Sequence, residues 1–140
     1  MKISTKGRYA LRLMVDLGLN AEENCCPVRE ISERQGISEK YLEQIISVLS
    51  KAGLVSSVRG AGGGYRLSRD PKQYTVGMLL RATEGSLAPV SCLTEGEPPC
   101  ERADSCTTLY IWEKIYEAVN NVVDSITLAD LIENEKGKRK

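Results

Sequence analysis

Three cysteines lie within fifteen residues in the second half of the chain, at Cys92, Cys100 and Cys106. Glu, Pro, Asp and Ser surround them, whereas an inert free cysteine is usually buried among apolar side chains. Thiolates are soft ligands that select iron–sulfur clusters, zinc or copper(I). The three thiols therefore predict a metal or iron–sulfur site, and loop cysteines without a ligand are the alternative.

The chain of 140 residues contains no histidine, so a fourth ligand has to be of another type. An oxygen donor, a residue of the first half or of a partner subunit, and an exogenous thiol all remain open; the nearby carboxylates are Glu95, Glu97, Glu101 and Asp104. The lack of histidine also excludes Ser–His–Asp triads and His-containing zinc fingers. Because no nucleophile is paired with a base along the sequence, we predict that the protein is not an enzyme and has no small-molecule substrate.

Two further cysteines, Cys25 and Cys26, are adjacent in the first half of the chain. Neighbouring side chains point apart and seldom chelate one ion together. We therefore interpret them as ordinary loop residues, with a redox-active thiol pair as the alternative.

The net charge of zero conceals an asymmetry between the two halves. Residues 1–70 carry 11 Lys and Arg against 8 Asp and Glu, and residues 71–140 carry 8 against 11. This distribution suits a basic half that faces a polyanion and an acidic half kept away from it. The longest apolar stretch is interrupted by Arg12 and Asp16, and the amino terminus lacks a signal-peptide core. We therefore expect a soluble, cytoplasmic protein with no membrane partner.

The basic half has the pattern of a helix-turn-helix. Apolar residues at helical spacing predict a first helix from about Ser4 to Asn20. A second, short helix starts at Val28 and is closed by Gly36, and a third follows the N-cap Ser38, so that the motif covers about residues 28–51. The third helix has one apolar face and one polar face, and the polar face is free to reach base edges in the major groove.

Two short strands around a glycine-rich turn, over about residues 54–68, predict the wing of a winged helix. The expected fold class is mainly α, with a winged helix-turn-helix DNA-binding domain over residues 1–84, a two-stranded wing and a long C-terminal dimerisation helix. The expected partner is double-stranded DNA, and the alternative is a solvated helix face in which Lys40 and Glu43 simply pair. The candidate DNA contacts are Lys6, Tyr9, Ser38, Lys40, Tyr41, Glu43, Gln44 and, at the wing tip, Arg59.

The acidic half divides into a loop and helices. Residues 85–108 lack a helical period and are predicted to form the cysteine-containing loop. Residues 109–134 are predicted to form a dimerisation helix and a terminal helix that starts at a capping box of Thr127 and Asp130, and residues 135–140 a disordered basic tail. Apolar residues of the longer helix step alternately by three and four, which favours a seam between two like helices, although packing on its own domain is the alternative. The predicted seam residues are Leu109, Trp112, Tyr116, Val119, Val123 and Ile126.

Several blocks of the sequence resemble the Rrf2 family of winged-helix repressors. They are MKISTKGRYA at residues 1–10, ISERQGIS at 31–38 with YLEQ at 41–44, GLVSSVRG at 53–60, GGGY at 62–65, and the three cysteines. The resemblance implies a homodimer that binds palindromic promoter DNA and controls iron–sulfur assembly genes. It also implies a 2Fe–2S cluster, held by Cys92, Cys100 and Cys106 near the dimer seam, whose occupancy governs this control. Two features depart from the pattern: the first two cysteines are two residues further apart, and Leu109 stands where a histidine ligand is found.

The leading hypothesis is therefore a transcriptional regulator, a repressor of iron–sulfur cluster biogenesis genes, whose promoter binding is controlled by a 2Fe–2S cluster. A related regulator that senses nitric oxide or cysteine status is one alternative. A zinc-binding or cluster-carrier module without sequence-specific DNA binding is an alternative of another class, with zinc as the alternative cofactor.

Overall fold

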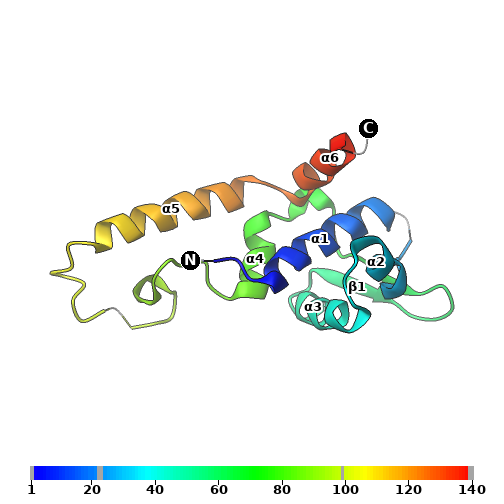
Figure 1. Cartoon of the computed structure of the whole chain (residues 1–140), viewed down its shortest axis with the longest axis horizontal. Coiled ribbons are helices and arrows are strands. Elements are labelled where there is room, and N and C mark those ends of the chain that lie inside the picture. The colour runs from blue at the N-terminus through cyan, green and yellow to red at the C-terminus, as the bar shows by residue number, and fades with distance from the viewer. Residues whose placement is uncertain (1, 22–23, 99, 139–140) are drawn as a thin grey trace.

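The computed structural model describes residues 2–21, 24–98 and 100–138, and Figure 1 shows how their elements are arranged. Helices dominate, with one two-stranded antiparallel sheet, which confirms the predicted winged helix-turn-helix. Within these ranges, no helix combines the length and the apolarity that crossing a bilayer requires. In chain order the elements are α1 (Thr5–Asn20), α2 (Val28–Gln35), α3 (Glu39–Lys51), β1 (Val55–Val58), β2 (Gly64–Leu67), η1 (Pro71–Gln73), α4 (Val76–Glu84), η2 (Ser91–Leu93), α5 (Leu109–Ser125) and α6 (Leu128–Lys138).

The helices of the helix-turn-helix begin and end where the sequence provides caps. Ser4 accepts a hydrogen bond from the N–H of Gly7 at the start of α1, and Ser38 accepts one from the N–H of Tyr41 at the start of α3. Gly36 ends α2 with a φ of 66°, a left-handed conformation that glycine adopts without strain. The apolar faces of α1 and α3 then meet in the main core, as their helical periodicity predicted.

The wing is fixed near its turn to the segment that precedes α2. Strands β1 and β2 pair in antiparallel register, with Val55 opposite Leu67. Tyr65 of β2 also exchanges two backbone hydrogen bonds with Cys26, of 2.8 and 2.9 Å. Gly64 permits this close approach, because a Cβ atom there would lie 2.4 Å from the carbonyl carbon of Cys26.

Tyr74 and the backbone beside it join the acidic half to the winged helix. The Tyr74 ring is fully buried, and its hydroxyl donates to the carbonyl of Leu54 at 2.7 Å, at the start of the wing. The N–H of Leu128 donates to the carbonyl of Tyr74 at 2.9 Å. Thr127 and Asp130 form the predicted capping box at the start of α6, with bonds of 2.9 and 3.1 Å.

Two predictions for the acidic half need correction. The predicted disordered tail over residues 135–140 is wrong for residues 135–138, because α6 continues to Lys138; residues 139–140 lie outside the described ranges. A Glu133–Lys136 pair at 3.6 Å and lysines in the last turn favour this extension, since cations stabilise a helix C-terminus. The cysteine loop is also not wholly irregular, because the single turn η2 includes Cys92.

Asp16 of α1 is the charged residue that the described chain buries completely. Its carboxylate accepts from Arg34 Nη2 at 2.8 Å, from Arg34 Nε at 3.0 Å and from Gln35 Nε2 at 2.9 Å. The hydrogen bond with Asp16 is the largest of the effects that raise the pKa of Arg34. Arg34 Nη2 also lies 2.7 Å from Cys26 Sγ, so the ion pair joins α1 and α2 to the segment that pairs with β2.

We expect Asp16→Ala to lower the free energy of unfolding by roughly 2–4 kcal/mol, because it leaves Arg34 and Gln35 without their buried acceptor. This cost is toward the low side of what breaking a buried ion pair usually costs, because the Arg34 side chain is 33% exposed. Urea unfolding at one protein concentration measures the change. Asp124→Ala is the matched control: its pair with Arg81 is exposed, so the expected cost is below about 1 kcal/mol. Equal losses in the two variants would contradict the central role of Asp16.

Candidate DNA-binding surface and cysteine loop

The predicted recognition helix presents its polar residues outward. Lys40, Glu43 and Gln44 of α3 are exposed, as is Ser38 at its N-cap. The other face of α3 is buried in the main core through Leu42, Ile45, Ile46 and Leu49. An exposed polar face on a helix that the core holds from behind can reach base edges in the major groove.

The contacts predicted on α1 lie beside those on α3. Lys6, Tyr9 and Tyr41 are half-buried, and the Tyr9 and Tyr41 rings meet edge to face with their centroids 5.7 Å apart. This ring pair places α1 and α3 in one surface. Arg59 is exposed in the turn between β1 and β2, which Figure 1 shows extending away from α2.

The three clustered cysteines differ in exposure: Cys92 and Cys106 are half-buried, and Cys100 is exposed. In this conformation, within residues 2–21, 24–98 and 100–138, no three Cys, Asp or Glu side chains are gathered closely enough to hold a metal ion. By donor chemistry the thiols suit an iron–sulfur cluster, since all three are free, none is fully buried and thiolates are its usual ligands. Holding such a group therefore requires the loop to bring them together.

The surroundings of Cys106 favour the thiolate form of its side chain. Its Sγ lies 3.4 Å from the hydroxyl oxygen of Thr108, at the N-cap of α5. Hydrogen bonds from the side chain and backbone of Thr108 lower the pKa of the Cys106 thiol. A lower pKa raises the thiolate fraction near neutral pH, and the thiolate is the form that binds metals.

The adjacent cysteines have different surroundings. Cys25 is half-buried, and its Sγ donates to the carbonyl of Gly62 in the wing turn at 3.1 Å. Cys26 is 2% exposed, and burial raises the pKa of its thiol despite the neighbouring Arg34. A buried thiol with a raised pKa is poorly reactive, which agrees with a structural part for Cys26.

Helix α4 connects the cysteine-bearing half to the first helix. Arg81 of α4 donates to Asp124 Oδ1 at 2.6 Å and to Asn120 Oδ1 at 2.9 Å, both on α5. The hydrogen bond from Arg81 lowers the pKa of Asp124. At the end of α4, Glu84 accepts from the backbone N–H of Ser4 at 3.0 Å and from its hydroxyl at 2.6 Å. One helix therefore contacts both α5 and the N-cap of α1.

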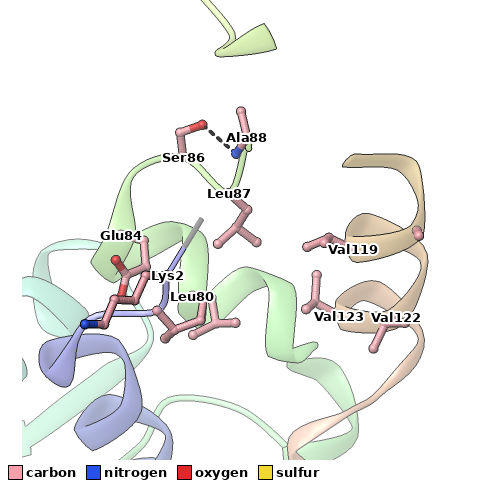
Figure 2. Close-up of a pocket in the computed structure, with 11 residues that line it drawn as sticks. Lys2, Leu80, Glu84, Ser86, Leu87, Ala88, Val119, Val122 and Val123 are labelled. Atoms are coloured by element: carbon pink, nitrogen blue, oxygen red, sulfur yellow. Dashed lines mark hydrogen bonds between the residues drawn. The ribbon is translucent and has the colours of Figure 1, made fainter. Parts of the chain in front are cut away.

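An apolar cavity of about 500 Å³ opens between α4 and α5. Figure 2 shows Leu80 and Leu87 on one side and Val119 and Val123 on the other, with Glu84 near one edge. Val122 of α5 also lines this cavity.

Helix α5 has apolar residues on two sides. From the predicted seam, Tyr116, Val119, Val123 and Ile126 pack against the cluster of Val76, Leu80 and Leu87 within the same chain, and Leu109 and Trp112 are half-buried. Elsewhere on α5, Tyr110, Ile111 and Val122 are 69%, 46% and 56% exposed. Four of the six predicted seam residues thus have apolar partners within their own chain.

The comparisons with known proteins agree with this geometry. The family model Rrf2, described as an iron-dependent transcriptional regulator, matches residues 3–134. The chain belongs to the Rrf2 family. Together with the winged-helix fold, this membership makes the protein a DNA-binding transcriptional regulator rather than an enzyme.

Named transcriptional regulators and their solved structures are similar to this chain. The HTH-type transcriptional regulator IscR of Serratia proteamaculans is 42% identical over 135 residues, which cover 96% of this chain and 81% of the relative; IscR of Aliivibrio salmonicida is 44% identical over 136 residues, which cover 96% and 80%. The solved structure of T. potens IscR is 42% identical with a TM-score of 0.80, covering 100% of this chain and 92% of that one. The structure of CymR, the global cysteine regulator of B. subtilis, is 42% identical with a TM-score of 0.78, covering 96% and 98%.

We expect Thr108→Val to slow the alkylation of Cys106, because losing the hydroxyl raises the pKa of the thiol and lowers its thiolate fraction. Metal-free protein is treated with iodoacetamide at pH 7.5, and modification at each cysteine is followed by peptide mass spectrometry. Cys100 is the internal control and should react at an unchanged rate. An unaltered Cys106 rate in the variant would show that the Thr108 hydroxyl does not act on this thiol.

Proposed function

We propose that this Rrf2 protein is a repressor of iron–sulfur cluster biogenesis genes whose binding to palindromic promoter DNA is controlled by a 2Fe–2S cluster. The observation that carries the proposal is the loop itself, which holds three free thiols and continues within three residues of Cys106 into α5. The similarity to IscR proteins and the iron-dependent description of the family support it. Cys92, Cys100 and Cys106 would hold the cluster, which supplies a redox-sensitive group whose presence reports on iron–sulfur supply.

The DNA contacts follow from the exposed surface of α1, α3 and the wing. Glu43 can accept from cytosine N4, Gln44 can pair with adenine, and Lys40 can reach guanine or a phosphate. Lys6, Tyr9, Ser38 and Tyr41 are proposed phosphate contacts, and Arg59 is proposed to enter the minor groove.

A homodimer through α5 completes the proposal, because the helix has more apolar surface than α4 covers. Ile111, Ile115, Ala118 and Val122 recur at spacings of four, three and four, so they form one stripe. At about 100° per residue, this stripe lies roughly 100° around α5 from the one that packs on α4. The proposed dimer contact therefore centres on Val122 and Ile111, with Leu109 and Trp112 of the original seam beside them.

Helix α4 offers the path by which the loop acts on DNA binding. A change in the loop shifts the start of α5, and Arg81 links α5 to α4 through Asp124 and Asn120. Glu84 at the end of α4 holds Ser4, the N-cap of the helix that carries Lys6 and Tyr9. Movement of α5 is thereby passed to the proposed phosphate contacts.

The deciding experiment purifies the full chain without oxygen and measures iron, sulfide and visible absorption together with affinity for its own promoter. We expect wild type to hold iron and sulfide, and Cys92→Ser, Cys100→Ser and Cys106→Ser each to lose them. Promoter affinity of wild type should differ by about tenfold between the loaded and metal-free forms, a usual size for coupling between two sites. Cys25→Ser is the matched control and should keep both iron and coupling.

Other outcomes would favour the alternatives. Promoter binding by a protein that never holds iron would favour cysteine sensing, as the similarity to CymR suggests. Loss of promoter binding on exposure to nitric oxide, with no response to cluster loss, would favour a nitric oxide sensor. Bound zinc without preference for the promoter would favour the carrier module.

We expect Val122→Glu to weaken the dimer by about tenfold or more, because the carboxylate would be buried against apolar surface of a second copy. The residue is 56% exposed in one chain, so the fold should be retained. Light scattering coupled to size exclusion over a concentration series measures the dissociation constant. Glu113→Lys, on the opposite side of α5, should leave it unchanged. A Val122→Glu protein that dimerises like wild type would place the interface elsewhere.

A further inference from the structure

Gln35, the last residue of α2, is locked in one orientation. Its Nε2 donates to the buried Asp16 carboxylate at 2.9 Å. A carboxylate can only accept, so the NH₂ group of Gln35 must face Asp16 and its Oε1 must face the other way. The amide oxygen is therefore presented to the surface in a fixed position.

Arg12 of α1 binds to this fixed amide. Its Nε donates to Gln35 Oε1 at 3.1 Å, and its Nη2 donates to the backbone carbonyl of the same residue. Two donors on one planar group fix the plane of the guanidinium as well as its position. Arg12 is exposed, but these two hydrogen bonds to Gln35 hold its guanidinium in place.

The fixed guanidinium lies over an aromatic ring of the proposed DNA surface. The central carbon of the Arg12 guanidinium is 5.1 Å from the centroid of the Tyr9 ring, within the range of a cation–π contact. The Tyr9 ring in turn meets the Tyr41 ring edge to face, with an interplanar angle of 66°. A continuous set of contacts thus runs from the buried Asp16 through Gln35 and Arg12 to the two tyrosines.

We propose that Arg12 is a positioning residue for DNA binding, which holds Tyr9, and through it Tyr41, in place for their phosphate contacts without contacting a phosphate itself. The inference rests on the proposed function, in which both tyrosine hydroxyls meet the DNA backbone. A tyrosine contact adds no charge, so correct placement of the rings changes affinity but not the number of counterions released. A direct Arg12–phosphate bond would change both, and this difference makes the two cases separable.

The test measures fluorescence anisotropy of a labelled promoter fragment over a salt series, with the full chain. Arg12→Lys keeps the charge but loses the planar fork, and Arg12→Met removes both. Each Arg12 substitution is made alone and combined with Tyr9→Phe, which keeps the ring and removes the hydroxyl. We expect both Arg12 variants to bind about two- to fivefold more weakly, the equivalent of an exposed cation–π contact, with the wild-type salt slope. With Phe at position 9 the loss should become smaller, because only the Tyr41 hydroxyl then remains to be placed.

Three results would overturn the inference: wild-type affinity of Arg12→Lys, a salt slope lowered by about one contact in Arg12→Met, or an equal loss in both Tyr9 backgrounds. Thermal unfolding by circular dichroism shows that each variant folds. Lys6→Met is the reference for a direct phosphate contact and should lower the slope by about 0.9. A wild-type protein without promoter preference, or an unchanged salt slope in Lys6→Met, would count against the proposed function. The role of Arg12 is decided separately, by comparing the Arg12 variants in the Tyr9 and Tyr9→Phe backgrounds.

Discussion

A carboxylate buried at the middle of α1 is the constraint on which the winged helix depends. Removing Asp16 from water is unfavourable unless donors replace the lost hydration, and the end of α2 supplies them through Arg34 and Gln35. Meeting this demand sets how α2 lies against α1. Both residues also make outward contacts, Arg34 with the sulfur of Cys26 beside β2 and Gln35 with Arg12 at the surface. The buried Asp16 carboxylate thus determines how surface residues of the proposed DNA-binding side are placed.

A second constraint acts on the other half of the molecule, where α5 is only partly covered. No residue of α5 among those described is fully buried in one chain. Its C-terminal part is held by Arg81 and by the cluster around Leu80, and its first turns project from the body with the cysteine loop (Figure 1). A helix held at one end and free at the other can change its course when the loop before it changes. This arrangement suits an element that transmits a signal better than one that only supports the fold.

The sequence predicted those parts of the fold that depend on local rules. Ser4, Ser38 and Gly36 cap their helices as expected, and the strands of the wing pair around the glycine-rich turn. Residues whose role depends on distant partners were not predictable in this way. In the sequence, Asp16 and Arg12 both looked like interruptions of an apolar run. Their partners lie on α2, and no periodicity within α1 reports them.

In the candidate site, too, local spacing predicted some residues correctly, whereas others depend on distant contacts. The exposed face of α3 follows from helical spacing alone, so the positions of Lys40, Glu43 and Gln44 agree with the prediction. The stripe on α5 was correctly recognised as apolar, but spacing cannot tell whether such a stripe meets its own chain or a second copy. Here four of its six residues pack on the cluster to which α4 contributes. For the cysteines, sequence proximity indicated a shared ligand, whereas their placement depends on loop conformations that residue types do not specify.

The close approach of Gly64 to the backbone of Cys26 bears on how mutational scans of this protein are to be interpreted. Any side chain at position 64 would push β2 away from the segment before α2 and tilt the whole hairpin. In a screen for promoter binding, Gly64 would then score as strongly as a residue that touches DNA, although its effect arises from the backbone of Cys26. A map of the operator contacts drawn from loss of binding alone would therefore count Gly64 as a DNA contact, unless thermal stability is scored for the same variants.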